Sequence, residues 1–244
     1  MVFILYACPT YITHHPNLPK NLYSPQTSNT MQKREILQIA AAIIVFAIII
    51  AFYPIILGEF TAIPQAILFS AIIILVSVFS RKLFANSLDA GVEHEIWQWQ
   101  RFGFKPHYKL NKSIPAGILF PLFFSVFSIG ILKIPTLLSY ETRALKTRAA
   151  KRFGHYSFSE MTDWHNALIG SAGIVSLLLL AVIAYFLPIP GFEYLSRLAT
   201  YYAFVNLLPI SKLDGTQIFF GSRILWTTLA IISAVFLSYA LLII

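Results

Sequence analysis

The chain has 244 residues, of which 57% are hydrophobic and only 11% are charged. Soluble domains carry about twice that charged fraction, so this composition and a mean hydropathy of +0.72 exclude an ordinary soluble protein. The formal charge of +8 does not indicate a nucleic-acid partner, because basic residues beside membrane spans set topology. The single cysteine, Cys8, excludes an internal disulfide and a zinc site built from cysteines. We expect a multi-pass protein of the cell membrane, in contact with lipid.

Residues 1–30 differ in composition from the rest of the chain. They combine a short apolar start with Pro, Ser, Thr and Asn, and they lack the basic region and the long apolar core of a signal peptide. Met31 precedes a few charged residues and then a long apolar run, which is a common start for a membrane protein. We expect 1–30 to be a disordered tail or a mis-assigned start, and 31–244 to form a single integral membrane domain.

Apolar runs long enough to cross a bilayer as helices, which takes about 20 residues, recur along this domain. They are Ile36–Leu57, Ile63–Ser80, Asn166–Leu187, Tyr194–Ile210 and Ile224–Ile244. Basic residues cluster in the loops that the positive-inside rule then places in the cytoplasm. The sequence therefore predicts about five transmembrane helices.

The connection between the second and third runs predicts two further elements. Within residues 83–103, apolar side chains recur at helical spacing, which predicts an amphipathic helix. Residues 114–138 are apolar but interrupted by prolines, and basic residues flank them on both sides. That segment must leave and return on one side of the membrane, so we expect a re-entrant or broken hairpin covered by protein or a water-filled cavity. The predicted fold is an all-α polytopic membrane protein.

The stretch FVNLLPISKLDG, residues 204–215, places Asp214 where hydrocarbon is expected. An ionisable group at the centre of a membrane costs about 2.5–3.5 kcal/mol on insertion scales, so something must compensate its charge. Pro209 removes a backbone donor and favours a bend, and Gly215 allows a close backbone approach. A bent helix with a polar niche around Asp214 is the expected result.

This stretch resembles the Asn-x-x-Pro-x-x-x-Leu-Asp-Gly motif of the site-2 protease family of intramembrane zinc metalloproteases. The matching residues are Asn206, Pro209, Leu213, Asp214 and Gly215. The resemblance implies that Asp214 is a zinc ligand at the bend of a membrane helix and that Asn206 orients the substrate. With the following FFGSRILW, which looks like a short tail of archaeal relatives, it covers roughly residues 36–230 in the order of elements.

The second signature of that family is His-Glu-x-x-His on a helix, whose histidines bind zinc and whose glutamate activates water. His94 and Glu95 match its first two positions in HEIWQ, but Gln98 replaces the second histidine. The string QRFG, which resembles one that archaeal relatives carry just after the zinc helix, moves the motif onto residues 91–95, where no position matches. Both registers stay open.

An active enzyme would be a zinc metalloprotease that cleaves membrane-embedded peptides. Its zinc would be held by His94, Asp214 and one of His155 or His165, with Glu95 as the catalytic base. The resemblance assigns substrate positioning to the residues of the other motif, namely Asn206, Pro209 and Gly215.

Two alternatives need no intact metal site. One is a catalytically inactive relative that acts as a membrane scaffold or as a regulator that binds transmembrane client helices. The other is a small transporter in which Lys133 and Asp214 form an ion or substrate pair, although the internal repeat of many transporters is not visible. In a protein without metal, His94, Glu93 and Glu95 would lie on the polar face of the amphipathic helix.

Overall fold

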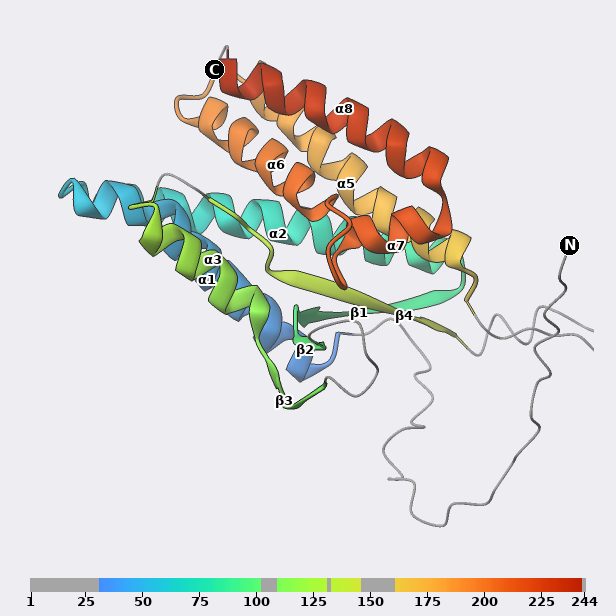
Figure 1. Ribbon diagram of the computed structural model, residues 1–244. Coiled ribbons are helices and arrows are strands. Elements are labelled where there is room, and N and C mark those ends of the chain that lie inside the picture. The colour runs from blue at the N-terminus through green and yellow to red at the C-terminus, as the bar shows by residue number, and fades with distance from the viewer. Residues whose placement is uncertain (1–30, 102–108, 131–132, 146–160, 243–244) are drawn as a thin grey trace, which may run out of the picture.

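The computed structural model describes residues 31–101, 109–130, 133–145 and 161–242. The predictions made for residues 1–30 and for His155 concern residues outside these ranges. Elements are labelled as in Figure 1.

Within the described residues, four helices are long and apolar enough to cross a membrane, which supports the membrane class. They are α1 (Lys33–Ile56), α2 (Ala62–Ser87), α5 (Asp163–Phe186) and α8 (Arg223–Leu242). The remaining predicted span, Tyr194–Ile210, is helical only as far as Asn206. It forms α6 (Phe192–Asn206), whose 15 residues rise about 22 Å, and a separate short helix, α7 (Asp214–Gly221), follows after a break.

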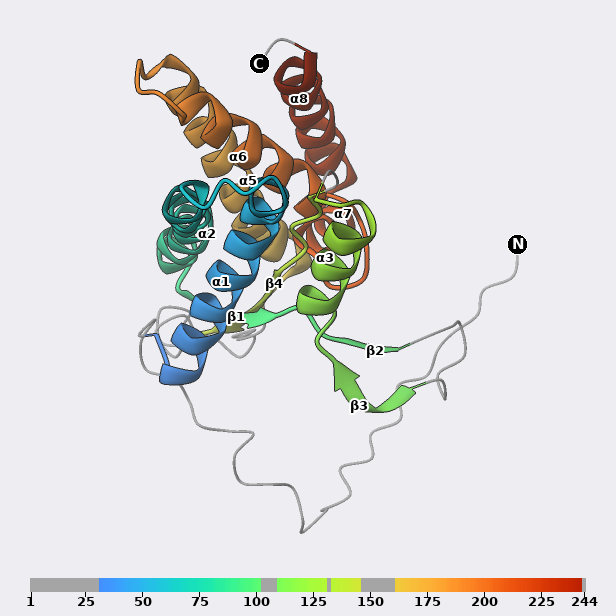
Figure 2. The same ribbon diagram turned by 90° about the vertical axis from the view of Figure 1, so that its left-hand side faces the viewer.

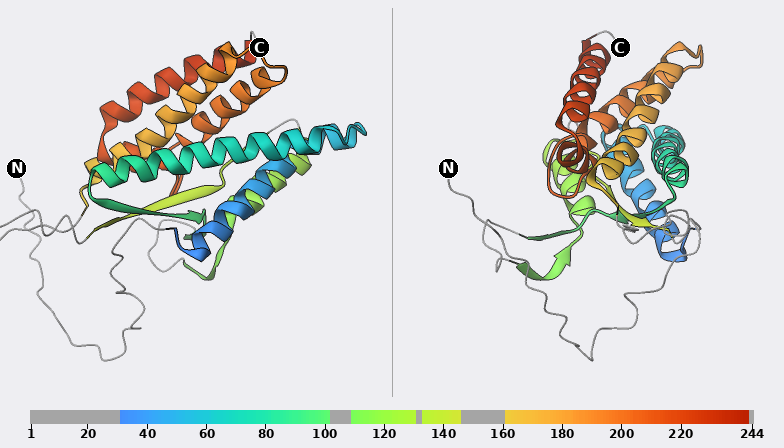
Figure 3. Two further views of the ribbon diagram at one scale, coloured as in Figure 1. Left: turned by 180° about the vertical axis from the view of Figure 1, so that it is seen from behind. Right: turned by 90° about the vertical axis from the view of Figure 1, so that its right-hand side faces the viewer.

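The helices pack in layers on either side of α2. Figure 1 shows α1 and the short helix α3 (Ala116–Phe127) on one side of α2, and α5, α6 and α8 on the other, and Figure 3 shows the same order from behind. The apolar core lies where α1, α2, α5 and α6 meet. Its fully buried members include Phe46, Ile73, Ile174 and Tyr202.

Two small antiparallel sheets correct the all-α prediction, although the described chain is mostly helical. In one, β1 (Ala90–Ile96) pairs with β4 (Leu138–Ala144), and in the other, β2 (Trp99–Arg101) pairs with β3 (Lys109–Ile114). Figure 2 shows both sheets at one end of the helical layers.

The amphipathic helix predicted for residues 83–103 is therefore wrong over β1 and β2. The apolar residues that suggested it, such as Val92 and Ile96, are four positions apart. A spacing of four fits one face of a helix, but it is also a multiple of the two-residue period of a strand. Here the even-numbered residues of β1 share a face, on which Val92 is 3% exposed and His94 is fully buried.

The broken segment 114–138 contains a short helix and an extended return. Helix α3 ends in a turn with positive φ at Ile129 and Gly130, and a Cβ on Gly130 would lie 2.9 Å from Tyr53 of α1. Lys133, which lies in the segment before β4, donates a hydrogen bond to the Tyr194 hydroxyl at the start of α6. These contacts fit a hairpin, and its depth in the membrane stays a prediction.

Candidate functional site

Asp214 is the first residue of α7, at the break that follows α6. Helix α6 ends at Asn206, and the turn that follows contains Pro209 and a positive φ of 53° at Ser211. Since proline restricts the residue before it to extended backbone, the helix cannot continue through this point. The break brings the Asp214 side chain into the protein, where the residue is 0% exposed.

Gly215 is required by this turn. A Cβ at position 215 would lie 1.9 Å from the carbonyl oxygen of Leu207, which is part of the backbone and cannot rotate away. The same carbonyl accepts a hydrogen bond of 2.9 Å from the indole of Trp226 on α8. Gly215 therefore sets the close approach of α7 to the end of α6, as its smallness predicted.

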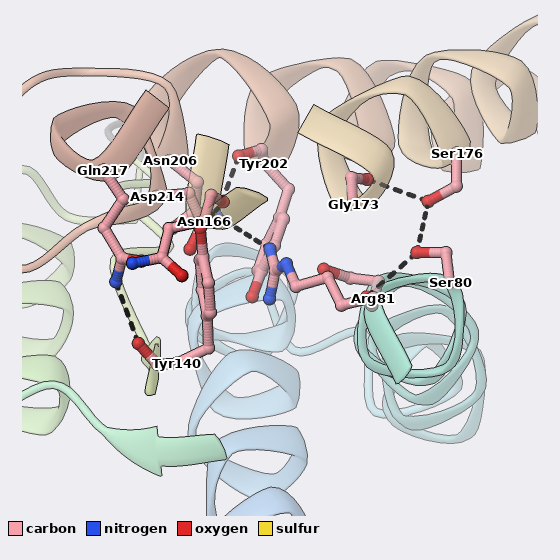
Figure 4. A network of polar contacts seen from close by, with 11 residues as sticks. Ser80, Arg81, Tyr140, Asn166, Gly173, Ser176, Tyr202, Asn206, Asp214 and Gln217 are labelled. Carbon is pink, nitrogen blue, oxygen red and sulfur yellow. Dashed lines mark hydrogen bonds and ion pairs between the residues drawn. The ribbon is translucent and has the colours of Figure 1, made fainter. Parts of the chain in front are cut away.

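The charge partner of Asp214 is Arg81 of α2. A terminal nitrogen of its guanidinium donates to Asp214 Oδ2 in a close ion pair, and the two side chains are 2% and 1% exposed (Figure 4). The guanidinium also lies 5.3 Å from the ring centre of Tyr140 on β4, within the range of cation–π attraction. Asp214 is thus compensated by a cation of the chain itself.

Arg81 fits against α5 because of a glycine. A Cβ on Gly173 would lie 2.4 Å from Arg81 Nε, and a Cβ on Gly170 would lie 2.4 Å from the Tyr140 hydroxyl. Two glycines of α5 therefore make room for two large side chains, one from α2 and one from β4. A hydrogen bond of 2.8 Å between Ser80 and Ser176 joins α2 and α5 beside them.

His94 belongs to a second buried group, around Glu35 of α1. Glu35 Oε1 lies 3.1 Å from His94 Nδ1 and accepts a 3.1 Å hydrogen bond from the His94 backbone N–H. Glu35 Oε2 accepts a 2.7 Å hydrogen bond from Lys82, the neighbour of Arg81 on α2. The adjacent basic residues of α2 thus reach two different carboxylates.

Burial lowers the pKa of His94 from its ordinary value of 6.5 to about 4, against the opposing effect of the Glu35 carboxylate. The ring is therefore neutral at pH 7, with the Nδ1 proton donated to Glu35. Its other nitrogen, Nε2, is buried and has no hydrogen-bond partner among the described residues.

Glu95 points to the other face of the sheet from His94, since successive side chains of a strand alternate. Its side chain is 35% exposed and lies 3.8 Å from Arg34, while Glu93 on the same face lies 3.3 Å from Arg143. The structure therefore does not bring Glu95 to the metal site predicted around His94 and Asp214.

The remaining candidates also have internal contacts. The Asn206 amide donates a 2.9 Å hydrogen bond to the Tyr202 carbonyl within α6, and the side chain is buried. His165, in the first turn of α5, contacts the hydroxyl of Thr162, which caps that helix. The transporter alternative required Lys133 to pair with Asp214. Instead, Lys133 donates a hydrogen bond to the Tyr194 hydroxyl.

A zinc ion does not fit these residues as they stand. Catalytic zinc takes about three protein ligands and an open position. Within the described ranges, no group of three or more His, Cys, Asp and Glu side chains could hold a metal. One oxygen of Asp214 is bound to Arg81, and His94 is held by Glu35 in a separate group.

Three residues of these groups were missed by sequence reasoning, namely Glu35, Arg81 and Lys82. The basic pair marks the predicted end of the second span, where the positive-inside rule explains it. However, α2 continues beyond this pair to Ser87. Charges inside a helix that remains apolar on both sides are a signal of burial with a partner.

Comparison of the chain with protein-family models, with curated proteins and with solved structures finds no match.

Proposed function

We propose that this chain is a site-2-protease-like protein of the cell membrane that does not cleave peptide bonds and instead binds transmembrane segments of client proteins. The proposal joins the resemblance of residues 204–215 to that family with a site that lacks the arrangement for hydrolysis.

The placement of His94 and Glu95 carries the proposal. A metal-bound water needs the base on the same side as the metal, whereas these residues lie on opposite faces of β1, one fully buried and the other paired with Arg34. The bend after α6 near Pro209 and the close packing of Gly215 agree with what the resemblance leads us to expect of residues 204–215.

Two apolar faces support a role in binding membrane helices. Helix α3, which is too short to span a bilayer alone, exposes large side chains such as Phe123 and Phe127, at 64% and 80%. Helix α8 has only three buried residues, Leu229, Ser233 and Ala240. In a membrane such faces contact lipid or another helix, and helix association there depends on packing and polar contacts between helices.

A reconstituted system separates binding from cleavage. The purified protein and a fluorescent single-span peptide are placed in the same lipid vesicles with added zinc. Energy transfer measures association, and mass spectrometry measures cleavage. We expect association, reduced when Phe123 and Phe127 are changed to Ala, and an intact peptide. Cleavage that depends on Glu95 would contradict the proposal, and so would peptide that never associates.

A further inference from the structure

The buried ion pair between Arg81 and Asp214 joins two helices that are far apart in the sequence. We propose that the Arg81 guanidinium occupies the place from which a metal ion would have to compensate Asp214, and that it acts as a permanent internal cation that fastens α7 to α2. The comparison with a metal site rests on the proposed family relationship, whereas the role of the ion pair does not.

Arg81 and Asp214 are both buried. Both side chains are almost completely removed from solvent, at 2% and 1% exposure. A buried charge persists only if it is paired and hydrogen-bonded, and removing one partner leaves the other uncompensated. Among the described residues, Asp214 Oδ1 has no hydrogen-bond partner, so the ion pair through Oδ2 is the main compensation of this carboxylate.

The surroundings of the Arg81 side chain fit a guanidinium. Gly173 leaves the space that Arg81 Nε fills, and Tyr140 presents its ring to the planar cation at 5.3 Å (Figure 4). Tyr140 is held in turn, because its hydroxyl donates a 2.9 Å hydrogen bond to the Asn166 carbonyl. A flat, delocalised cation stacks on an aromatic ring and pairs with a carboxylate, which suits Arg better than Lys.

The face of α2 that carries Arg81 has no usual zinc ligand one turn away on either side. A zinc-binding helix places its two histidines one turn apart, so that both reach the metal. One turn before and after Arg81, the same buried face of α2 carries Ser77 and Ala85, neither of which is a usual zinc ligand. At these positions, the helix in contact with Asp214 therefore supplies a cation and no usual metal ligand.

The consequence is mechanical. Helix α7 is joined to α2 by the ion pair and to β4 by Gln217, whose amide donates a 2.9 Å hydrogen bond to the Tyr140 carbonyl. The bend after α6 is therefore held in place with no dependence on metal supply. A metal site can lose its ion, whereas the Arg81 cation is part of the chain and stays beside Asp214.

A double-mutant cycle tests the proposal. The variants are Arg81→Met, Asp214→Asn and the two together, and the readout is the melting temperature in detergent. Each single change leaves a buried group without its partner and should lower the melting temperature by about 10 °C. The double variant removes both charges and should recover at least half of that loss. Losses that add in the double variant would overturn the proposal, as would a single variant as stable as the wild type.

The exposed pair Lys212–Glu141, with an N–O distance of 3.4 Å and side chains 65% and 49% exposed, is the matched control. Lys212→Met, Glu141→Gln and their combination should each stay close to the wild type, because exposed pairs contribute little. If both buried single variants fail to accumulate, folded protein from the double variant supports the proposal, and its failure to accumulate overturns it. The cycle uses no client and no substrate, so its result is independent of the vesicle experiment.

Discussion

Gly173 of α5 lies directly against the Arg81 side chain of α2, so that a Cβ at position 173 would come 2.4 Å from Arg81 Nε. The glycine and the arginine are therefore a matched pair, in which the absent side chain of one provides the volume for the other. That relationship joins the packing of the helices to the electrostatics of Asp214, because the side chain that fills this space is the one that pairs with the carboxylate.

The change Gly173→Ala should destabilise the protein by about 1–3 kcal/mol, the usual cost of overpacking. The added methyl group would push Arg81 away from Asp214. Chemical unfolding in detergent measures the loss. The control is Val175→Leu, which adds volume on the same helix at a position that is 41% exposed and should change the stability by less than about 0.5 kcal/mol. Equal stability of the two variants would show that the Arg81 side chain does not pack tightly against Gly173.

The change Gly215→Ala should be more damaging, at about 3 kcal/mol or more, because the atom in the way is the Leu207 carbonyl oxygen at 1.9 Å. Backbone cannot rotate aside as a side chain can, so the turn between α6 and α7 must open. Size-exclusion profiles and melting temperatures report the effect. Lys212→Ala, in the exposed part of the same turn, is the control and should behave like the wild type.

The two carboxylates near His94 should respond differently to neutralisation. Glu35→Gln removes the buried partner of Lys82, at 2.7 Å, and should cost about 3–5 kcal/mol. Glu95→Gln breaks a half-exposed contact of 3.8 Å with Arg34 and should cost less than about 1 kcal/mol. The two unfolding curves are compared under the same conditions. A Glu95 variant that is the less stable of the two would contradict the assignment of Glu35 as the structural carboxylate.

His94 should make the stability depend on pH. Its folded pKa of about 4 lies below the ordinary 6.5, so between these values the unfolded chain binds more protons than the folded one. The contribution of neutral His94 to the free energy of unfolding is therefore fully present above pH 6.5 and is lost as the pH falls toward 4. Between pH 7 and pH 5 the free energy of unfolding should fall by about 2 kcal/mol through this residue.

The control for this pH effect is His94→Gln, which keeps Glu35, Lys82 and Arg81 in place. The difference between the two pH curves then isolates the imidazole. A wild-type curve that runs parallel to that of the variant from pH 7 to pH 5 would show that the ring is not buried as described.

Much of the helical fold could be predicted from the sequence, because long apolar runs have few alternatives in a membrane protein. The spans at α1, α2, α5 and α8 were found in this way, and the bend after α6 followed from Pro209. The burial of Asp214 was expected from its position in an apolar stretch and is present, at 0% exposure. Each of these features depends on residues close together in the sequence.

The parts that could not be predicted depend on partners far away or on an ambiguous period. Arg81 and Asp214 are 133 positions apart, and the basic pair of α2 already had a local explanation as a topology signal. Strand β1 was mistaken for a helix because a spacing of four fits both periods. As a strand, it turns His94 and Glu95 to opposite faces, which a single sequence cannot show without the pairing to β4.

Metal content tests the role of Arg81 without any mutation in the native protein. The protein is produced in zinc-supplemented medium, its zinc is measured by mass spectrometry, and its melting temperature is recorded with and without a strong chelator. If Arg81 is the cation for Asp214, the protein should carry far less than stoichiometric zinc and its melting temperature should not change with the chelator. Stoichiometric zinc that stabilises the fold, and that is lost in Asp214→Asn, would contradict this assignment and restore the metalloprotease hypothesis.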